Sequence, residues 1–96
     1  MNHPNKILII DDEVKITEVI KSYLERSGYE VYTAFNGEQS LEAFEKVQPA
    51  LVILDLMLPD MSGEEICRRL RKQSRVPIIM LTAKIEEPDI IHGLDI

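Results

Sequence analysis

The chain has 96 residues, 45% of them apolar and 29% charged, which is typical of one small folded domain and excludes a disordered chain. Its formal charge of −6 argues against direct binding of a nucleic-acid backbone, because phosphates require a basic face. The opening MNHPNKILII is too weakly apolar for a signal peptide or a membrane span, and the single Cys67 cannot form an internal disulfide. We therefore expect a cytoplasmic protein that contacts neither membrane nor nucleic acid.

The first predicted element is a strand over Lys6–Ile10, whose uninterrupted apolar run is typical of a parallel sheet covered on both faces. Three acids follow it, Asp11, Asp12 and Glu13. Next comes a predicted helix that ends at Gly28 and has apolar residues at helical spacing: Ile16, Val19, Ile20, Tyr23 and Leu24.

Residues 29–34 alternate in polarity, which predicts a shorter and more exposed strand. Asn36, with Gln39 three residues later, has the spacing of an N-cap. The helix that it begins carries an apolar stripe and ends before Pro49: Leu41, Phe44 and Val47.

The stretch ALVILDLMLPDMSG, residues 50–63, predicts a central buried strand that ends at the carboxylate of Asp55. Asp60 belongs to the turn that follows, and turn formation explains it adequately. Ser62 and Glu65 have the spacing of a capping box. They predict a helix over about 63–73 whose inward residues are Ile66, Cys67 and Leu70.

A fourth buried strand is predicted over 77–82, with Pro77 as its first residue. Pro88 then has the position of a first-turn proline, and it predicts a last helix with Ile90, Ile91 and Leu94 on its apolar face. Strands that alternate with helices predict an α/β fold: a flavodoxin-like, doubly wound parallel sheet with strand order 2-1-3-4.

In that strand order the first and third strands are neighbours, so Asp11, Asp12 and Asp55 meet at one edge of the sheet. Ionised carboxylates that lie together require a proton or a cation between them. Hard oxygen ligands without histidine or cysteine favour Mg²⁺. A carboxylate beside Mg²⁺ can attack phosphorus to give an aspartyl phosphate. Thr82, at the end of the fourth strand, has the position to donate a hydroxyl to the phosphoryl oxygens.

These residues carry a family resemblance. Asp11-Asp12, LDLMLPDMSG around Asp55 and IIMLTAK around Thr82 resemble the receiver domain of bacterial two-component response regulators, most similarly those followed by a winged-helix DNA-binding domain (the OmpR/PhoB-like class). The resemblance implies that Asp55 accepts a phosphoryl group from a sensor histidine kinase and that Thr82 switches position on activation. It also implies that the Mg²⁺ ligands are Asp12, Asp55 and the backbone carbonyl of Met57, with Asp11 acting largely through water.

The resemblance further implies that residues 1–96 are a receiver domain incomplete at its C-terminus. The family's fifth strand and helix, its lysine on that strand and the output domain are absent. Lys84 follows Thr82 too closely to be that lysine. The fourth strand would then have an exposed apolar edge, which predicts self-association. The domain would modify only itself, so it would not be an enzyme with an external product.

Simpler roles for the same residues, and different functions on the same fold, compete with a receiver domain. Asp12 alone is more often a helix N-cap, and Asp55 alone a turn former. A flavin or nucleotide site would need a glycine-rich phosphate loop after the first strand, where three acids stand instead. Mg²⁺-dependent phosphatase-like hydrolases carry a DxD pattern that begins at the nucleophile. In this chain the second aspartate of that pattern is replaced by Met57. A flavodoxin-like binding module that is never phosphorylated is a further alternative.

Overall fold

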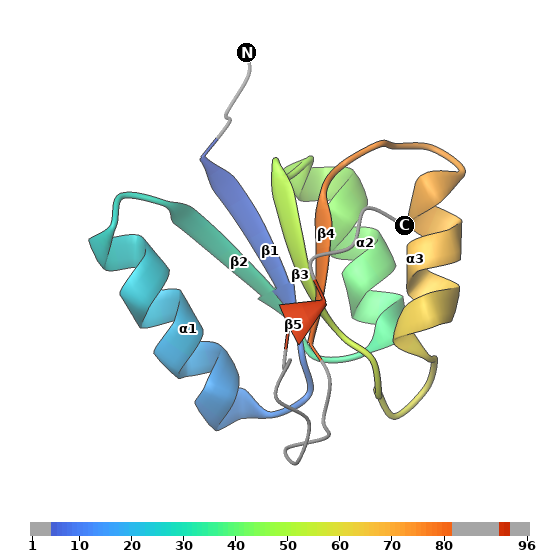
Figure 1. Ribbon diagram of the computed structural model, residues 1–96, viewed down its shortest axis with the longest axis horizontal. Coiled ribbons are helices and arrows are strands. Elements are labelled where there is room, and N and C mark those ends of the chain that lie inside the picture. The colour runs from blue at the N-terminus through green and yellow to red at the C-terminus, as the bar shows by residue number, and fades with distance from the viewer. Residues whose placement is uncertain (1–4, 82–90, 93–96) are drawn as a thin grey trace.

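A computed structural model describes residues 5–81 and 91–92 (Figure 1). Strands and helices alternate along most of the chain. Their order is β1 (Lys6–Ile10), α1 (Val14–Arg26), β2 (Glu30–Ala34), α2 (Gly37–Val47), β3 (Leu51–Asp55), α3 (Gly63–Arg71), β4 (Ile78–Leu81) and β5 (Ile91–His92).

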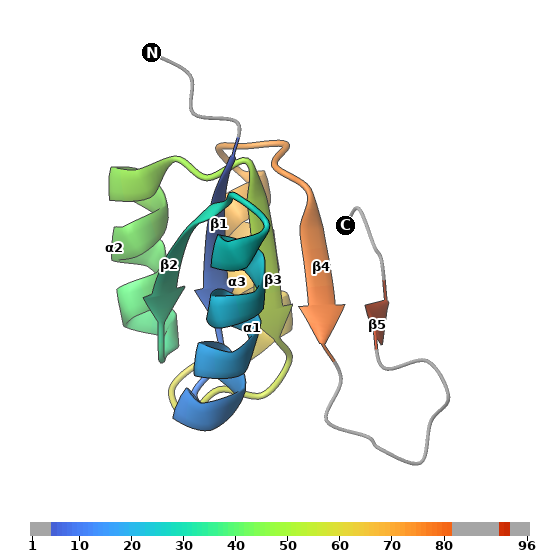
Figure 2. The same ribbon diagram turned by 90° about the vertical axis from the view of Figure 1, so that its left-hand side faces the viewer.

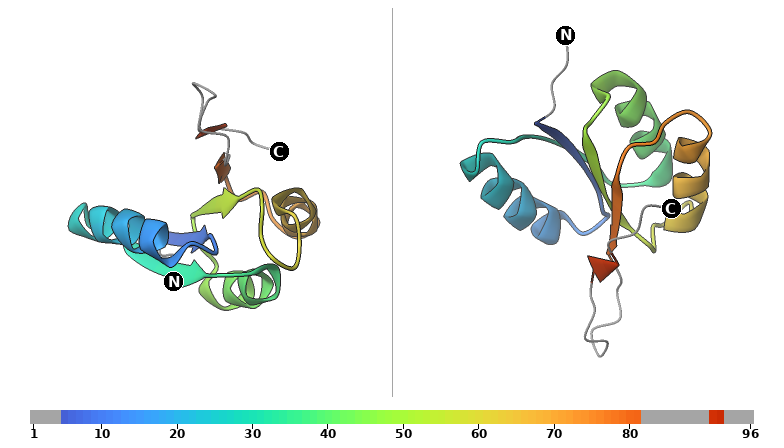
Figure 3. Two further views of the ribbon diagram at one scale, coloured as in Figure 1. Left: turned by 90° about the horizontal axis from the view of Figure 1, so that it is seen from below. Right: turned by 45° about the horizontal axis from the view of Figure 1, so that its top comes forward.

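The strands form one sheet in the order β2-β1-β3-β4-β5. The first four are parallel, with β1 between β2 and β3, so the predicted order 2-1-3-4 is confirmed. Helix α1 covers one face of the sheet, and α2 and α3 lie side by side on the other (Figures 2 and 3). This is the doubly wound α/β arrangement that the sequence predicted.

Strand β1 is buried on both faces because its side chains alternate between two apolar clusters. Leu8 and Ile10 belong to the larger cluster, on the side of α2 and α3, whereas Ile7 and Ile9 belong to a smaller one on the side of α1. Each of the four is no more than 3% exposed. The uninterrupted apolar run therefore matches a central parallel strand.

The helix ends follow local sequence signals. Asn36 Oδ1 accepts a hydrogen bond from Gln39 N at 2.8 Å, as the N-cap prediction requires. Gly28 has φ +98°, a left-handed conformation that suits glycine just beyond the end of α1.

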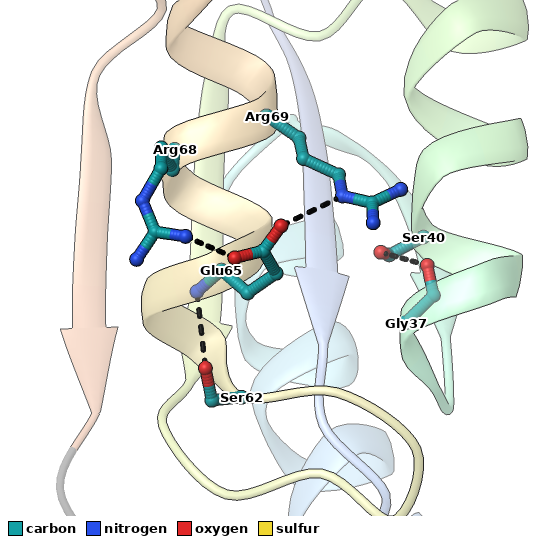
Figure 4. A network of polar contacts seen from close by, with 6 residues as sticks. All are labelled: Gly37, Ser40, Ser62, Glu65, Arg68 and Arg69. Carbon is teal, nitrogen blue, oxygen red and sulfur yellow. Dashed lines mark hydrogen bonds and ion pairs between the residues drawn. The ribbon is translucent and has the colours of Figure 1, made fainter.

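The capping box at Ser62 is only half confirmed (Figure 4). Ser62 Oγ accepts from Glu65 N at 3.1 Å, as predicted. The carboxylate of Glu65, however, pairs with Arg68 and with Arg69, the latter at 3.0 Å. The arginines lie one turn further along the same helix, so they compete for the carboxylate that a capping box would direct back to Ser62.

The prediction for the C-terminal region was wrong where it can be compared. Ile91–His92 form a short strand, not part of a helix, and pair antiparallel with Met80 and Leu81 of β4. The edge of β4 is therefore partly occupied. A backbone pairing of this kind depends on a distant partner, which helical periodicity alone does not reveal. The rest of the predicted helix lies outside the described residues.

Helix α1 also differs from the prediction. Ile20 and Leu24 pack against the smaller apolar cluster, but Val19 and Tyr23 are 69% and 70% exposed and Ile16 is exposed as well. The apolar stripe of this helix is wider than the surface that the sheet offers it.

Candidate functional site

Three carboxylates meet where β1 and β3 end. Asp11 and Asp12 directly follow β1, and Asp55 is the last residue of β3. One carboxylate oxygen from each residue lies within 4.8 Å of the others. The convergence predicted from strand order is therefore confirmed, since neighbouring parallel strands bring their carboxyl ends to one edge.

Asp11 is the buried member of this acidic cluster, at 4% exposure, and it also supports the start of α1. Its Oδ1 accepts a hydrogen bond from Glu13 N at 2.9 Å. Glu13 is the N-cap residue of α1, yet its own side chain makes no capping bond. The interpretation of Asp12 as a simple N-cap is thus wrong. The side-chain acceptor at the start of α1 is Asp11, and Asp12 is exposed beside it.

The electrostatics of the cluster disfavour a charged Asp55. Partial burial raises the pKa of the Asp55 carboxyl above its ordinary value, and the neighbouring carboxylates of Asp11 and Asp12 raise it further. A hydrogen bond from Met57 N to Asp55 Oδ1, at 3.2 Å, opposes this rise in pKa. A bound cation would relieve the same repulsion.

The loop after β3 is held close to the site by its backbone. Leu56 N donates to Leu81 O at 3.2 Å, Gly63 N donates to Leu56 O at 2.8 Å, and Met57 forms a bridge with Ser62. A Cβ atom on Gly63 would lie 2.5 Å from Asp55 O, which is closer than real Cβ atoms come. Glycine at position 63 therefore permits the helix to begin against the end of β3.

Asp60 has a larger role than the turn former that the sequence suggested. Its Oδ1 accepts from Gly37 N at 2.7 Å and its Oδ2 accepts from Glu38 N at 3.1 Å, so it binds the N-terminus of α2. These backbone bonds hold the pKa of the Asp60 carboxyl below its ordinary value, and the bond from Gly37 contributes most. No local signal could have revealed this contact, because its partners lie more than twenty residues earlier.

Thr82 lies outside the described residues. Its neighbour Leu81 ends β4 and pairs in register with Asp55. The strand that leads to Thr82 thus ends beside the acidic cluster.

The residues present fit a hard divalent cation. Three carboxylates contribute anionic oxygen, and neither histidine nor cysteine belongs to the cluster found among the described residues. Such a donor set suits Mg²⁺ better than zinc or copper. Asp11 is buried, Asp55 is partly buried and Asp12 is exposed, so the cluster could be approached from solvent.

Comparison with known proteins gives a consistent result. The response regulator receiver domain family matches residues 7–96. The chain is 50% identical over 95 residues to the probable transcriptional regulator ycf27 of Pyropia yezoensis, covering 99% of this chain and 39% of that protein. It is 49% identical over 92 residues to the alkaline phosphatase synthesis transcriptional regulatory protein PhoP of Bacillus subtilis, covering 95% and 38%. The chain thus spans less than two fifths of these relatives.

Solved structures agree with this match. The response regulator TrrA of Thermotoga maritima, in complex with Mg²⁺ and BeF, has a TM-score of 0.78 at 43% identity, over 84% of this chain and 71% of that chain. The BeF3-activated N-terminal receiver domain of RstA from Klebsiella pneumoniae has a TM-score of 0.81 at 34% identity, over 86% and 71%. Within the described residues, no helix is long and apolar enough to cross a membrane.

Proposed function

This chain belongs to the response regulator receiver domain family, and from that premise we propose that Asp55 is its phosphoacceptor, in a site that binds Mg²⁺. The observation that carries the proposal is the acidic cluster itself, in which carboxylate oxygens from the ends of two neighbouring strands lie within 4.8 Å of one another. Receiver domains are phosphoryl-accepting signalling switches, not conventional enzymes.

In the proposed step, an Asp55 carboxylate oxygen attacks phosphorus and the bond to the phosphodonor breaks, which gives an aspartyl phosphate. Asp11, Asp12, Asp55 and the backbone carbonyl of Met57 would hold the ion, Asp11 largely through water. When bound there, Mg²⁺ would supply positive charge to stabilise the phosphoryl oxygens. The hydrogen bond from Met57 N to Asp55 Oδ1 orients the nucleophilic carboxylate.

The family supports three further roles. Thr82, although it lies outside the described residues, would hydrogen-bond the phosphoryl group and change position on activation. The donor would be a sensor histidine kinase. The named relatives are transcriptional regulators, which supports a DNA-binding output domain as the element under control.

Intact mass spectrometry tests the proposal directly. The chain is incubated with Mg²⁺ and acetyl phosphate, beside Asp55→Asn and beside a sample that contains EDTA. We expect a gain of one phosphoryl group in the wild-type chain with Mg²⁺, and no gain in either control. Labelling that persists in Asp55→Asn would place the acceptor elsewhere.

Release of inorganic phosphate separates the switch from the hydrolase alternative. A receiver modifies itself once per cycle, so phosphate release should follow the decay of labelled protein. Many rapid turnovers on an outside phosphomonoester would instead indicate a phosphatase-like hydrolase.

A further inference from the structure

The loop between β3 and α3 is tied to a different helix by one side chain. Both carboxylate oxygens of Asp60 accept backbone hydrogen bonds from the first turn of α2, Oδ1 from Gly37 N at 2.7 Å and Oδ2 from Glu38 N at 3.1 Å. A carboxylate at a helix N-terminus also interacts favourably with the helix dipole. We call this pair of bonds the Asp60 clamp.

The helix does not need Asp60 for all of its capping. The side-chain oxygen of Asn36 already accepts a hydrogen bond from Gln39 N at 2.8 Å. Its backbone carbonyl accepts one from Ser40 N at 3.0 Å. Asp60 satisfies the two remaining amide groups of the first turn. The N-terminus of α2 is thus shared between its own N-cap and a loop that comes later in the chain.

Close packing accompanies the clamp. A Cβ atom on Gly37 would lie 2.8 Å from Cβ of Met61 and 3.2 Å from Oδ1 of Asp60. Gly37 therefore permits the loop to approach the helix. The helix itself is anchored in the core by Phe44, which is 4% exposed. The clamp thus joins the loop to a rigid element.

The clamped loop is the one that contains Met57. It is closed at its base by the bridge between Met57 and Ser62 and by the bond from Gly63 N to Leu56 O, at 2.8 Å. Asp60 lies between these base contacts in sequence, and its clamp holds the middle of the loop together with Leu58 and Met61, which pack against the larger apolar cluster. Loss of the clamp would remove the polar contacts between the loop and α2 and loosen the loop, while the side chains of Asp11, Asp12 and Asp55 would stay unchanged.

We propose that Asp60 is a positioning residue for the divalent-cation site, which acts by holding the Met57 loop against the N-terminus of α2. This inference rests on the proposed function, in which the Met57 carbonyl is a ligand. Asp60 does not belong to the group of carboxylates that Asp11, Asp12 and Asp55 form. It lowers the freedom of a backbone ligand before the cation arrives, as outer-shell partners do in other metal sites.

The test is a Mg²⁺ titration of ¹⁵N-labelled chain followed by amide chemical shifts, with Asp60→Ala, Asp60→Asn and Glu38→Ala. Asp60→Ala should weaken Mg²⁺ binding about tenfold, the lower range for loss of an outer-shell partner. Asp60→Asn keeps one acceptor oxygen and should fall between Asp60→Ala and wild type. Glu38→Ala removes an equal charge from the same helix end but keeps its amide group, so its affinity should stay within about twofold of wild type.

Two further readouts separate positioning from a general loss of structure. Amide hydrogen exchange at Gly37 and Glu38 should accelerate in Asp60→Ala without a matching change in the core strands. With acetyl phosphate, the Mg²⁺ concentration that gives half-maximal labelling should rise, whereas the rate at saturating Mg²⁺ should remain close to wild type.

The outcomes distinguish this inference from the function on which it rests. If wild type binds Mg²⁺ and a folded Asp60→Ala binds it equally well, the positioning role is wrong and the proposed function stands. If wild type does not bind Mg²⁺ at all, the proposed function fails. Should Asp60→Ala lack a dispersed spectrum, Asp60→Asn decides: wild-type affinity despite faster exchange at Glu38 overturns the inference.

Discussion

Asp55 is charged at an energetic cost when no cation is bound. Burial and the carboxylates of Asp11 and Asp12 raise its pKa, so the folded chain holds this proton more tightly than the unfolded chain. The contribution of Asp55 to stability is therefore fully present below the ordinary aspartate pKa and is lost as pH rises through the raised pKa. At neutral pH the site favours a positive ion or a neutral side chain.

Asp55→Asn should for this reason be more stable than wild type at pH 7 in EDTA, by about 0.5–1 kcal/mol, the size of a partly exposed charge interaction. Asparagine keeps an oxygen that can accept from Met57 N. Urea unfolding measures the difference, and it should vanish at pH 3, where the aspartate is protonated. Added Mg²⁺ should stabilise wild type more than the variant. A variant that is less stable in EDTA at pH 7 would contradict the electrostatic explanation.

Gly63 is required by close approach of two backbones. An added Cβ atom would meet Asp55 O at 2.5 Å and Leu56 Cα at 2.8 Å, and neither atom belongs to a movable side chain. We expect Gly63→Ala to lower the free energy of unfolding by about 1–3 kcal/mol, as overpacking does, and to shift amide signals around Asp55. The exposed neighbour substitution Glu64→Ala serves as the control, with an expected change below about 0.5 kcal/mol. Equal stability of the two variants would show that the helix can move away.

Single residues differ in how far the sequence revealed them. The acidic cluster could be predicted, because each aspartate follows an apolar strand and parallel strands end at one edge. The sequence around Asp60 indicates only a turn residue, because its partners Gly37 and Glu38 lie more than twenty positions earlier and leave no local signal. Thr82 and the carbonyl role of Met57 stay predictions that depend on the family.

Among the elements, α1 shows the limit of helical periodicity. The spacing of its apolar residues predicted the helix, but Ile20 and Leu24 face the sheet while Val19 and Tyr23 face solvent. Apolar periodicity gives the presence of an amphipathic helix, whereas the packing partner decides which positions become buried. The same limit applies to Ile91–His92, where strand pairing with β4 replaced the predicted helix.

Helix α3 shows how neighbours redistribute a local signal. Ser62 caps the helix as its sequence predicted, but Glu65 pairs with Arg68 and Arg69 instead of completing a capping box. All of these side chains lie at the surface, where such pairs contribute little to stability and mainly keep the carboxylate ionised. The pKa of the Glu65 carboxyl accordingly lies below its ordinary value, and the hydrogen bond from Arg69 is the largest cause.

The sheet is incompletely paired along the outer side of β4. β5 covers Met80 and Leu81 but forms no pair with Ile78 and Ile79. No other strand lies at that edge within the described residues. This edge leaves backbone groups of β4 that a strand of a second chain could pair with. The exposed Val19 and Tyr23 of α1 provide apolar surface that a second chain could cover.

We therefore expect self-association that increases with concentration. Sedimentation equilibrium should give a weight-average mass above that of the monomer at high protein concentration. Apolar contact should persist or strengthen in 1 M NaCl, because salt screens the repulsion between two chains of formal charge −6. A monomer at all concentrations and both salt conditions would contradict this expectation.

The sequence alone determined the sheet order, the alternation of strands and helices, the Asn36 cap and the meeting of Asp11, Asp12 and Asp55. Each follows from a local pattern combined with the geometry of parallel strands. Only the tertiary structure decided that Asp60 binds the start of α2, that β5 pairs with β4 and that three of the five residues in the apolar stripe of α1 remain exposed. Those features depend on which distant segments pack or pair with one another. A local sequence pattern does not identify the contacting segment, so it cannot predict the energy of the contact.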